Sequence, residues 1–190
     1  MLTHKGTQRI NTDRLLLRKL EVADANDMFK NWATDSEVTK FLSWKPHENI
    51  EVTKEIMQQW VNEYESSDNY NWAIELKDIG EVIGGISLMK IDEKHHSCEV
   101  GYCMSRMYWN NGIMSEALKG VINYLFSEVG FNRIVATHDT NNVASGKVMI
   151  KSGMKHEGTL RQAKFRDNKG FYDLAIYAIL RDEWLNGLEK

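Results

Sequence analysis

One stretch of the chain, residues 98–130, combines a strand, a tight turn and a long helix, and it restricts the possible folds more than any other. The helix is its clearest part, because apolar side chains recur at intervals of three and four residues and form one stripe. The stripe consists of Ile113, Met114, Ala117, Leu118, Val121, Ile122, Leu125, Phe126 and Val129. Residues 98–104, rich in β-branched, aromatic and small side chains, predict a strand. The stretch therefore predicts a strand whose turn leads directly to a helix N-terminus.

The four residues between strand and helix, Trp109–Gly112, predict a tight turn that is suited to binding an anion. Backbone N–H groups at a helix N-terminus lack partners within the helix and attract phosphate groups, above all a pyrophosphate. Ordinary turn chemistry with a helix cap is the alternative explanation of the Asn-Asn-Gly sequence. The turn has neither the glycine spacing of a dinucleotide-binding fold nor the lysine of a P-loop.

The composition of the chain fits one folded domain, residues 1–190, with a core from about residue 10 to residue 184. Hydrophobic residues make up 42% and charged residues 27%, as in an ordinary soluble globular protein. The net charge of −3 argues against a general nucleic-acid binder, which would be basic. No apolar run approaches the ~18 residues of a membrane span, and the N-terminus lacks the apolar segment of a signal peptide. We therefore expect a cytoplasmic protein that does not enter a membrane.

The cysteines and histidines do not indicate a disulfide or a metal site. Cys98 and Cys103 lie five positions apart on one predicted strand, so their side chains point to opposite faces and cannot easily bridge. The six histidines show no ligand spacing, and the adjacent pair His95-His96 falls in a predicted turn. We expect two structural thiols and no metal.

The remaining patterns predict a mixed α/β sheet of about seven strands, with four helices on both faces. The predicted strands cover residues 14–20, 71–77, 81–91, 98–104, 132–138, 154–163 and 171–180. The predicted helices cover residues 24–34, 50–66, 113–130 and 143–151. Gly84 and Gly85 indicate a bulge or close packing in their strand. Residues 35–45 show no clear pattern, and the charged connection 164–170 is expected to be exposed.

Three runs of the sequence resemble the GCN5-related N-acetyltransferases (GNAT), and more narrowly the branch that acetylates the N-termini of ribosomal proteins. The runs are GTQRINTDRLLLRKLEVADA, EVGYCMSRMYWNNGIMSEAL and NNVASGKVMIKSGMKHEGTLRQA, and the similarity extends from about Gly6 to Trp184. The resemblance implies the GNAT fold and transfer of an acetyl group from acetyl-CoA, as co-substrate, to a primary amine. The amine would belong to a ribosomal or other protein N-terminus or to a small molecule, and the enzyme could form a homodimer.

The resemblance also implies which residues hold acetyl-CoA. The pantetheine arm would lie along the central strand and form backbone hydrogen bonds with Tyr102, Cys103 and Met104. The pyrophosphate would bind the turn and the first helical residues, which are Trp109, Asn110, Asn111, Gly112, Ile113, Met114 and Ser115. Only Gly112 is retained from the family's motif in this turn, and the larger Met114 side chain would hinder a close approach.

A second pair, Asn142 and Ser145, opens the predicted helix 143–151. In the family this asparagine holds the pantetheine or a linked water, and a serine three residues later lies on the same side of the helix. The resemblance makes Ser145 the candidate acid that protonates the thiolate of coenzyme A. Many relatives instead use a tyrosine seven residues after the asparagine, but that position is Met149 here. The alternative is that Asn142 and Ser145 only cap the helix.

The base that removes the proton from the amine is less clearly marked. The position of the branch's proposed catalytic carboxylate holds Lys164, and a lysine is protonated at neutral pH. Glu99 is the alternative candidate, because strand alternation places it on the same face as Gly101, whose missing side chain leaves room for an acceptor. Two further routes stay open, an ordered water and the imidazole of His138.

Two functions of other classes fit parts of the sequence. A non-catalytic acyl-CoA-binding sensor is favoured only by the lack of an obvious base. A nucleotide-binding regulatory domain is argued against by the absence of both common nucleotide-binding motifs. The sequence therefore favours an enzyme that acts by direct attack of an amine on a thioester.

Overall fold

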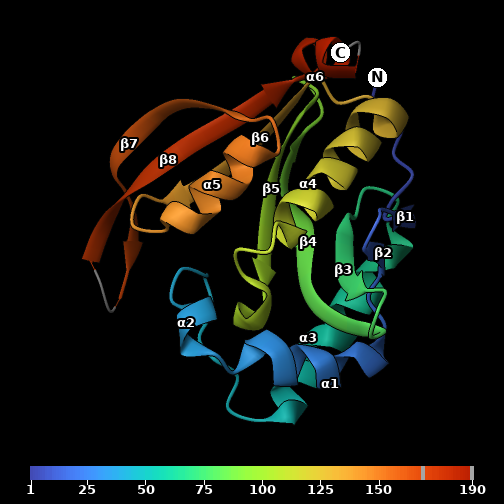
Figure 1. The fold of residues 1–190 in the computed structure, drawn as a ribbon, viewed down its shortest axis with the longest axis vertical. Helices are drawn as coiled ribbons and strands as arrows, with labels where there is room; N and C mark the ends of the chain where they lie inside the picture. The colour runs from blue at the N-terminus through green and yellow to red at the C-terminus, as the bar shows by residue number, and fades with distance from the viewer. Residues whose placement is uncertain (168–169, 189–190) are drawn as a thin grey trace.

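The computed structural model describes residues 1–167 and 170–188, whose strands form one mixed sheet of eight strands (Figure 1). The strands are β1 Ile10–Asn11, β2 Leu15–Lys19, β3 Asn71–Leu76, β4 Glu81–Asp92, β5 Ser97–Met104, β6 Arg133–Asp139, β7 Lys155–Arg166 and β8 Gly170–Leu180. Their order across the sheet is β1-β2-β3-β4-β5-β6-β8-β7. Neighbours are antiparallel except for β5 and β6, which run parallel. The helix that must cross between parallel strands is the long one predicted from the sequence.

The predicted mixed sheet with helices on both faces is confirmed, and each predicted strand is present. The additional strand is β1, whose two residues pair with β2 and are too few to show a periodic pattern. The predicted connection 164–170 is largely strand, because β7 extends to Arg166 and β8 begins at Gly170. Residues 168–169 of that connection lie outside the described residues.

The helices of the described residues are α1 Ala25–Met28, α2 Ser36–Thr39, α3 Ile50–Asn62, α4 Ile113–Tyr124, α5 Val143–Lys151 and α6 Arg181–Leu188. The predicted helix 24–34 is irregular, since α1 lies between a 3₁₀ turn, Val22–Asp24, and a π-helical turn, Phe29–Ala33. The sequence pattern does not predict α6, which is anchored by the ring of Trp184 at 5.4 Å from that of Phe126. Within the described chain, no helix combines the length and the apolar character needed to cross a membrane.

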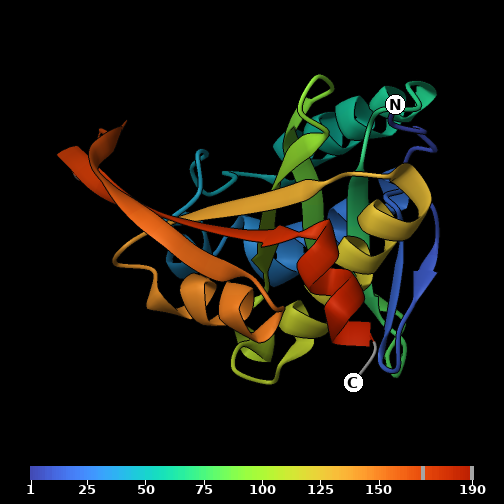
Figure 2. The same cartoon turned by 90° about the horizontal axis from the view of Figure 1, so that it is seen from above.

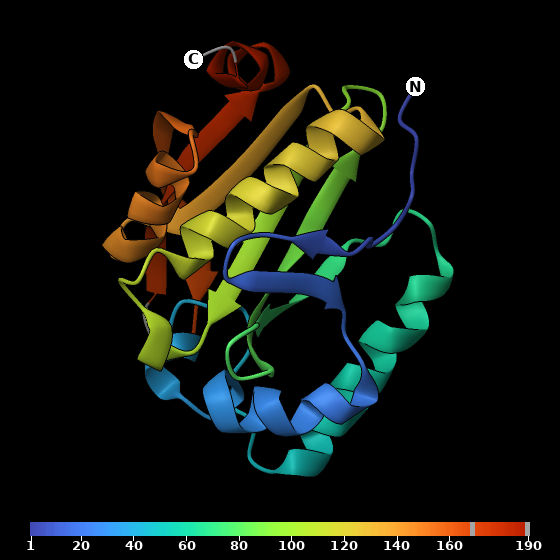
Figure 3. The same ribbon diagram turned by 45° about the vertical axis from the view of Figure 1, so that its right-hand side comes forward.

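Two hydrophobic clusters cover the two faces of the sheet, because successive residues of a strand point to opposite sides. On one face, α4 and α5 pack over Val100 and Met104 of β5. On the other face, α1 and α3 pack over Ala73, Val82 and Cys103. We call these the α4–α5 face and the α1–α3 face, and Figure 3 shows α4 lying across the strands of the first.

Gly84 marks a very close approach of β4 and β5. A Cβ at this position would lie 2.5 Å from the carbonyl oxygen of Cys103, so a larger residue would push the two strands apart. The pairing of β3 with β4 also shifts register beside it, between Ile74 and Glu75. The predicted bulge or close packing at Gly84 and Gly85 is therefore confirmed.

The parallel pair β5–β6 is short, and its end opens the middle of the sheet. Pairing ends at Val100 opposite Ala136, although β5 continues to Met104. β6 continues to Asp139 and pairs with β8 along its whole length on its other side. Within the described residues, Gly101–Met104 therefore have no strand partner on the side of β6, and we call these four residues the open edge of β5. The hairpin β7–β8 projects far from the body of the molecule (Figure 2).

Candidate active site

The turn before α4 presents backbone donors without partners. Gly112, the N-cap, has φ 73° and ψ 2°, and Asn110 also adopts a left-handed conformation with φ 63°. The N–H of Glu116 donates to the Gly112 carbonyl oxygen at 3.0 Å and is the first of the helix to find an acceptor. Among residues 1–167 and 170–188, no acceptor bonds the N–H groups of residues 113–115. These three donors at a helix N-terminus provide a favourable place for an anion.

The side chains of the first turn of α4 point into the core, away from these donors. Met114 and Ser115 are only 5% and 8% exposed, and Ile113 is buried beside them. The bulk of Met114 therefore lies on the inner side of the helix, where it does not hinder an approach to the turn. Trp109 folds back onto β5, and its indole N–H donates to the Met104 carbonyl oxygen at 2.9 Å. This bond uses one of the two lone pairs of the Met104 oxygen and ties the turn to β5.

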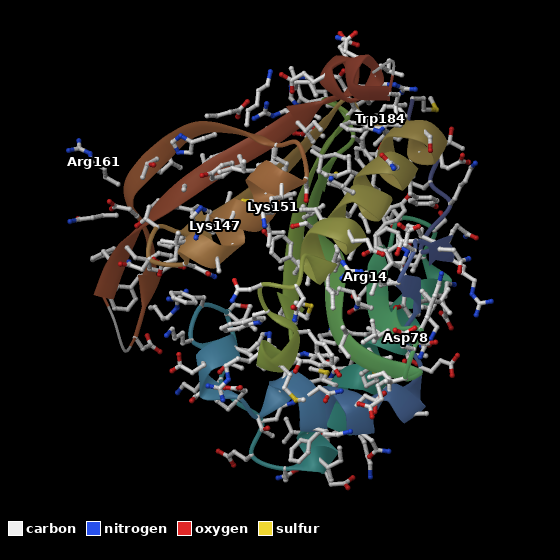
Figure 4. All side chains as sticks on the ribbon, viewed as in Figure 1. Arg14, Asp78, Lys147, Lys151, Arg161 and Trp184 are labelled. Carbon is white, nitrogen blue, oxygen red and sulfur yellow. The ribbon has the colours of Figure 1, made fainter. Side chains whose placement is uncertain are left out.

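Arg14 belongs to the turn, although the sequence pattern does not reveal it. Its guanidinium donates to the Asn111 carbonyl oxygen at 3.0 Å and to the Glu116 carboxylate at 2.6 Å. Thr12 donates to the same carboxylate at 2.6 Å. Burial raises the pKa of Glu116, but the hydrogen bonds from Thr12 and Arg14 outweigh it and leave the pKa below its ordinary value. Arg14 thus balances the one acidic charge beside the free N–H groups, and Figure 4 shows it near the start of α4.

The two thiols lie on opposite faces of β5, as strand alternation predicts. Cys98 belongs to the cluster of the α4–α5 face, and Cys103, on the open edge, packs against the cluster of the α1–α3 face. Burial raises the pKa of both thiols, that of Cys103 to about 12. Both thiols therefore stay protonated at neutral pH, and neither is an activated nucleophile. In the described part of the chain, no three His, Cys, Asp or Glu side chains are grouped to hold a metal ion.

α5 begins beside the open edge with the pair marked in the sequence. Asn142 is the N-cap, and its side-chain oxygen accepts a hydrogen bond from the Ser145 N–H at 3.3 Å, so its capping role is confirmed. The hydroxyl and carbonyl oxygens of Ser145 both lie 3.0 Å from the phenol oxygen of Tyr102, within hydrogen-bonding distance of its one proton. Sequence reasoning assigned only the backbone of Tyr102 to the site. Strand alternation, which places Tyr102 on the same face as Val100 and Met104, is the signal that directs its side chain toward α5.

Glu99 points to the α1–α3 face, and the space predicted beside it is filled. Its Oε1 accepts a hydrogen bond from the Thr137 hydroxyl at 2.8 Å. A Cβ at Gly101 would lie 2.9 Å from Cγ of Met89, whose side chain covers that glycine. The expectation of free room at Gly101 is therefore wrong, because β4 bulges here and brings Met89 over the neighbouring strand.

His138 follows Thr137 on β6 and therefore points to the face opposite Glu99. Its Nδ1 lies 2.8 Å from the Asp139 carbonyl oxygen, which can only accept, so Nδ1 carries the proton. Nε2 is buried against Gly146 of α5 and has no hydrogen-bond partner among the described residues. This placement removes His138 from the candidates for a base on the α1–α3 face.

Asp139 anchors the loop that leads into α5. Its carboxylate accepts two hydrogen bonds of 2.9 Å from the backbone and side-chain amides of Asn141. It also forms an ion pair of 3.2 Å with Arg166 of β7, with side-chain exposures of 1% for Asp139 and 17% for Arg166. Arg166 donates in addition to the carbonyl oxygen of Phe41, which follows α2. Three segments that are distant in sequence therefore meet at the start of α5, while Lys164 remains exposed on β7.

Comparisons with known proteins show the family of the chain. The family model described as an acetyltransferase (GNAT) domain matches residues 14–155. The uncharacterized N-acetyltransferase YoaA of Bacillus subtilis is 34% identical over 172 residues, which are 90% of this chain and 96% of that protein. A ribosomal-protein-serine acetyltransferase of Escherichia coli is 31% identical over 102 residues, 54% of this chain and 56% of that protein. The crystal structure of a GNAT-family acetyltransferase from Bacillus anthracis has a TM-score of 0.81 at 28% identity, over 92% of this chain and 99% of that chain. The chain therefore belongs to the GNAT family of acetyltransferases.

Proposed function

We propose that the chain transfers the acetyl group of acetyl-CoA to a primary amine by direct attack of the amine on the thioester. The observation that carries the proposal is the open edge of β5, with the Ser145 hydroxyl on one face of the sheet and the carboxylate of Glu99, two positions before the edge, on the other face. The free N–H groups at the start of α4 lie at the end of the same strand–turn–helix stretch. Membership in the GNAT family supports acetyl-CoA as the donor.

The α4–α5 face fits the chemical parts of acetyl-CoA. The pyrophosphate of acetyl-CoA would accept hydrogen bonds from the N–H groups of residues 113–115, where the helix dipole favours negative charge. Arg14 lies beside the turn, and the exposed lysines Lys147 and Lys151 of α5 add positive charge on the side seen in Figure 4. The amides of the pantetheine arm would pair with Tyr102 and Cys103 on the open edge, as an added strand does.

Each proton and charge of the reaction then has a candidate group. A backbone N–H of the open edge, aimed at the thioester oxygen, would stabilise the tetrahedral oxyanion by about 3 kcal/mol. Ser145 would give its proton to sulfur as the C–S bond breaks. Glu99, directly or through a water, would accept the proton that the amine loses. The protonated state of Cys98 and Cys103 supports a direct transfer without an acetylated cysteine.

For the acceptor we propose a protein N-terminus in preference to a small amine. One relative is, by its name, an acetyltransferase of a ribosomal protein, and the projecting hairpin β7–β8 offers a strand edge to an extended peptide (Figure 2). An α-amino group has an ordinary pKa of about 7.7–8.0, so a sizeable fraction is unprotonated at neutral pH. Such an acceptor needs little help from a general base. This suits the α1–α3 face, where Glu99, directly or through a water, is the proposed proton acceptor.

Thiol release from acetyl-CoA, followed with a thiol reagent over a panel of small amines and peptides, tests the proposal. We expect release with peptides that carry a free N-terminus and none with an N-terminally blocked copy of the same peptide. A small amine whose kcat/KM exceeds that of each peptide by about tenfold or more would reverse the choice of acceptor. Tight binding of acetyl-CoA without thiol release for any acceptor would favour the alternative function, a non-catalytic acyl-CoA sensor.

A further inference from the structure

We propose that the phenol of Tyr102 is a positioning group of the reaction, which orients the Ser145 hydroxyl so that its proton points to the departing sulfur. The inference rests on the proposed function, because it gives Ser145 the role of acid. It concerns the side chain of Tyr102, in addition to the backbone contacts proposed for this residue above.

The position of Tyr102 on β5 explains why its side chain reaches α5. The residue lies two positions beyond Val100, where the pairing of β5 with β6 ends. Its ring packs against the core of the α4–α5 face, and its hydroxyl lies 3.0 Å from both the side-chain and the carbonyl oxygen of Ser145. The phenol therefore bridges the open edge of β5 and the first turn of α5.

The hydrogen-bonding capacity of the two hydroxyls allows two arrangements. Each hydroxyl has one proton to donate and two lone pairs to accept with. If Tyr102 donates to the Ser145 carbonyl oxygen, the Ser145 proton points to Tyr102 and is held there. If Tyr102 donates to Ser145 Oγ, the Ser145 proton is free to point elsewhere. In the described chain, Tyr102 is the only side chain that bonds Ser145 Oγ, so it alone decides between the two.

The second arrangement is the one that supports thiolate departure. The C–S bond of the tetrahedral adduct breaks with its electron pair moving to sulfur, and the proton of Ser145 Oγ moves to the same sulfur. The oxygen of Ser145 then carries a developing negative charge, which the O–H of Tyr102 stabilises by donating to it. A proton from solvent restores the serine, and the proton lost by the amine passes to solvent in turn, so the exchange is balanced.

A phenol is well suited to this position. An aliphatic hydroxyl alone is a poor acid, and a donor directed at its oxygen makes loss of its proton easier. Burial raises the pKa of Tyr102, against a smaller opposing effect of the hydrogen bond with Ser145, so the phenol keeps its proton and remains a donor at neutral pH. The ring can also be retained while the hydroxyl is removed, which allows the role of the hydroxyl to be tested separately from packing.

The experiment compares Tyr102→Phe, Ser145→Ala and the double variant in the thiol-release assay with one good acceptor. We expect Tyr102→Phe to lower kcat about tenfold, while acetyl-CoA affinity by calorimetry and the acceptor KM stay within about twofold. In the Ser145→Ala background, Tyr102→Phe should change kcat by less than about twofold, because the group on which it acts is gone. Tyr124→Phe is the matched control, since it removes a phenol that donates to the Gly6 carbonyl oxygen at 2.8 Å far from the site.

A second variant keeps the test decisive if Tyr102→Phe does not fold. Replacement of Tyr102 by 3-fluorotyrosine retains the ring and the hydroxyl but lowers the phenol pKa. We expect kcat to rise by about twofold when Ser145 is present and to stay unchanged in the Ser145→Ala background, because the more acidic phenol is a stronger hydrogen-bond donor to the serine oxygen.

Three outcomes would overturn the inference. The first is an equal decrease of kcat from Tyr102→Phe in the presence and in the absence of Ser145. The second is an effect of Tyr102→Phe on KM or acetyl-CoA affinity alone, with kcat unchanged. Both would assign Tyr102 to packing or binding and leave the proposed acetyl transfer intact. The third is a wild-type protein that binds acetyl-CoA but releases no thiol with any acceptor. That result would remove the proposed function as well, so the two failures can be told apart.

Discussion

The two faces of the sheet at the open edge of β5 differ in how firmly their polar groups are held. On the α4–α5 face, Arg14 bonds the carbonyl of Asn111 in the turn, and Trp109 ties the turn to β5. Tyr102 bonds Ser145 at the start of α5. These side chains have their partners before any ligand arrives, so ligand binding need not order them.

The α1–α3 face is held more loosely. Glu99 accepts a hydrogen bond from Thr137, and the flexible side chain of Met89, which is 65% exposed, covers Gly101. A small apolar cavity of about 110 Å³ on this side is lined by Met28, Trp44, His47, Ile56 and Trp60. The difference is that the polar side chains of the α4–α5 face are joined to one another, whereas an exposed, flexible methionine and a small apolar cavity lie on the α1–α3 face.

The largest effect that tests this contrast is expected from Ser145→Ala. Removal of the proposed acid should lower kcat by ~10², with the dissociation constant of acetyl-CoA nearly unchanged, since the hydroxyl acts mainly in the transition state. Thr34→Ala is the control, because its exposed hydroxyl donates to the Phe29 carbonyl oxygen at 3.2 Å in the helical segment that follows α1. If turnover barely changes in Ser145→Ala, the serine only belongs to the helix cap and solvent protonates the thiolate.

Glu99→Gln should have the next largest effect and locate the proton acceptor on the α1–α3 face. We expect a loss of about 10- to 100-fold in kcat/KM at neutral pH, and a recovery as the pH rises and free amine accumulates. Lys164→Ala should change kcat little, because this exposed lysine lies on β7, where it would at most affect acceptor binding. Profiles of kcat/KM against pH provide the measurement. An unchanged kcat/KM in Glu99→Gln together with a large loss in Lys164→Ala would move the role of proton acceptor from Glu99 to Lys164.

Gly112→Pro should weaken acetyl-CoA binding by more than about tenfold. Proline fixes φ near −65°, whereas Gly112 has φ 73°, so the turn that exposes the N–H groups of α4 cannot form. Gly80→Pro is a matched control, since Gly80 also has a positive φ of 64° but lies in the turn between β3 and β4. Calorimetry on folded variants should show the affinity loss for Gly112→Pro alone, and an unchanged affinity would exclude this turn as the pyrophosphate site.

The smallest expected effect is on the pH dependence of stability and involves His47, which lies on the α1–α3 face. Burial lowers the pKa of His47, whose Nδ1 lies 2.8 Å from the Thr53 hydroxyl oxygen. Because the folded-state pKa lies below that of the unfolded chain, its contribution to stability is complete above about pH 6.5 and decreases as the pH falls. His47→Gln should reduce the loss of unfolding free energy between pH 7 and pH 5. Equal slopes in denaturant titrations of the two proteins would refute this.

Features that depend on neighbouring residues could be predicted from the sequence. The apolar stripe runs through α4 and the π-helical turn Leu125–Val129 that continues it, and the left-handed Gly130 follows that turn; these are properties of one segment, and they are present. β1, with two residues, carries no periodic signal, and α6 buries only part of Trp184. The position of Met89 depends on a bulge in β4, and simple alternation along a strand does not foresee a bulge.

The polar contacts of the candidate site join segments that are far apart, and these could not be predicted. Tyr102 and Ser145 are 43 positions apart, and Arg14 and Glu116 are 102 positions apart. Residue types at single positions mark Ser145 and Glu99 as candidates, but their partners depend on how β2 and β5 pack against α4 and α5. A family resemblance indicates the candidate site residues, but their hydrogen-bond partners are known only from the three-dimensional structure.

The open edge of β5 also bears on how this protein avoids aggregation. A strand with unpaired backbone groups at the margin of a sheet is a template on which another chain can pair, and proteins usually cover or shorten such margins. Here the unpaired segment lies between β5 and β6, in the interior of the sheet order, with α5 beside it. A whole strand of a second protein would have to part β6 from β5 to reach it, whereas a thin, flexible molecule can enter from the end. The arrangement would therefore offer the hydrogen bonds of an exposed strand to a small ligand and protect them from pairing with another chain.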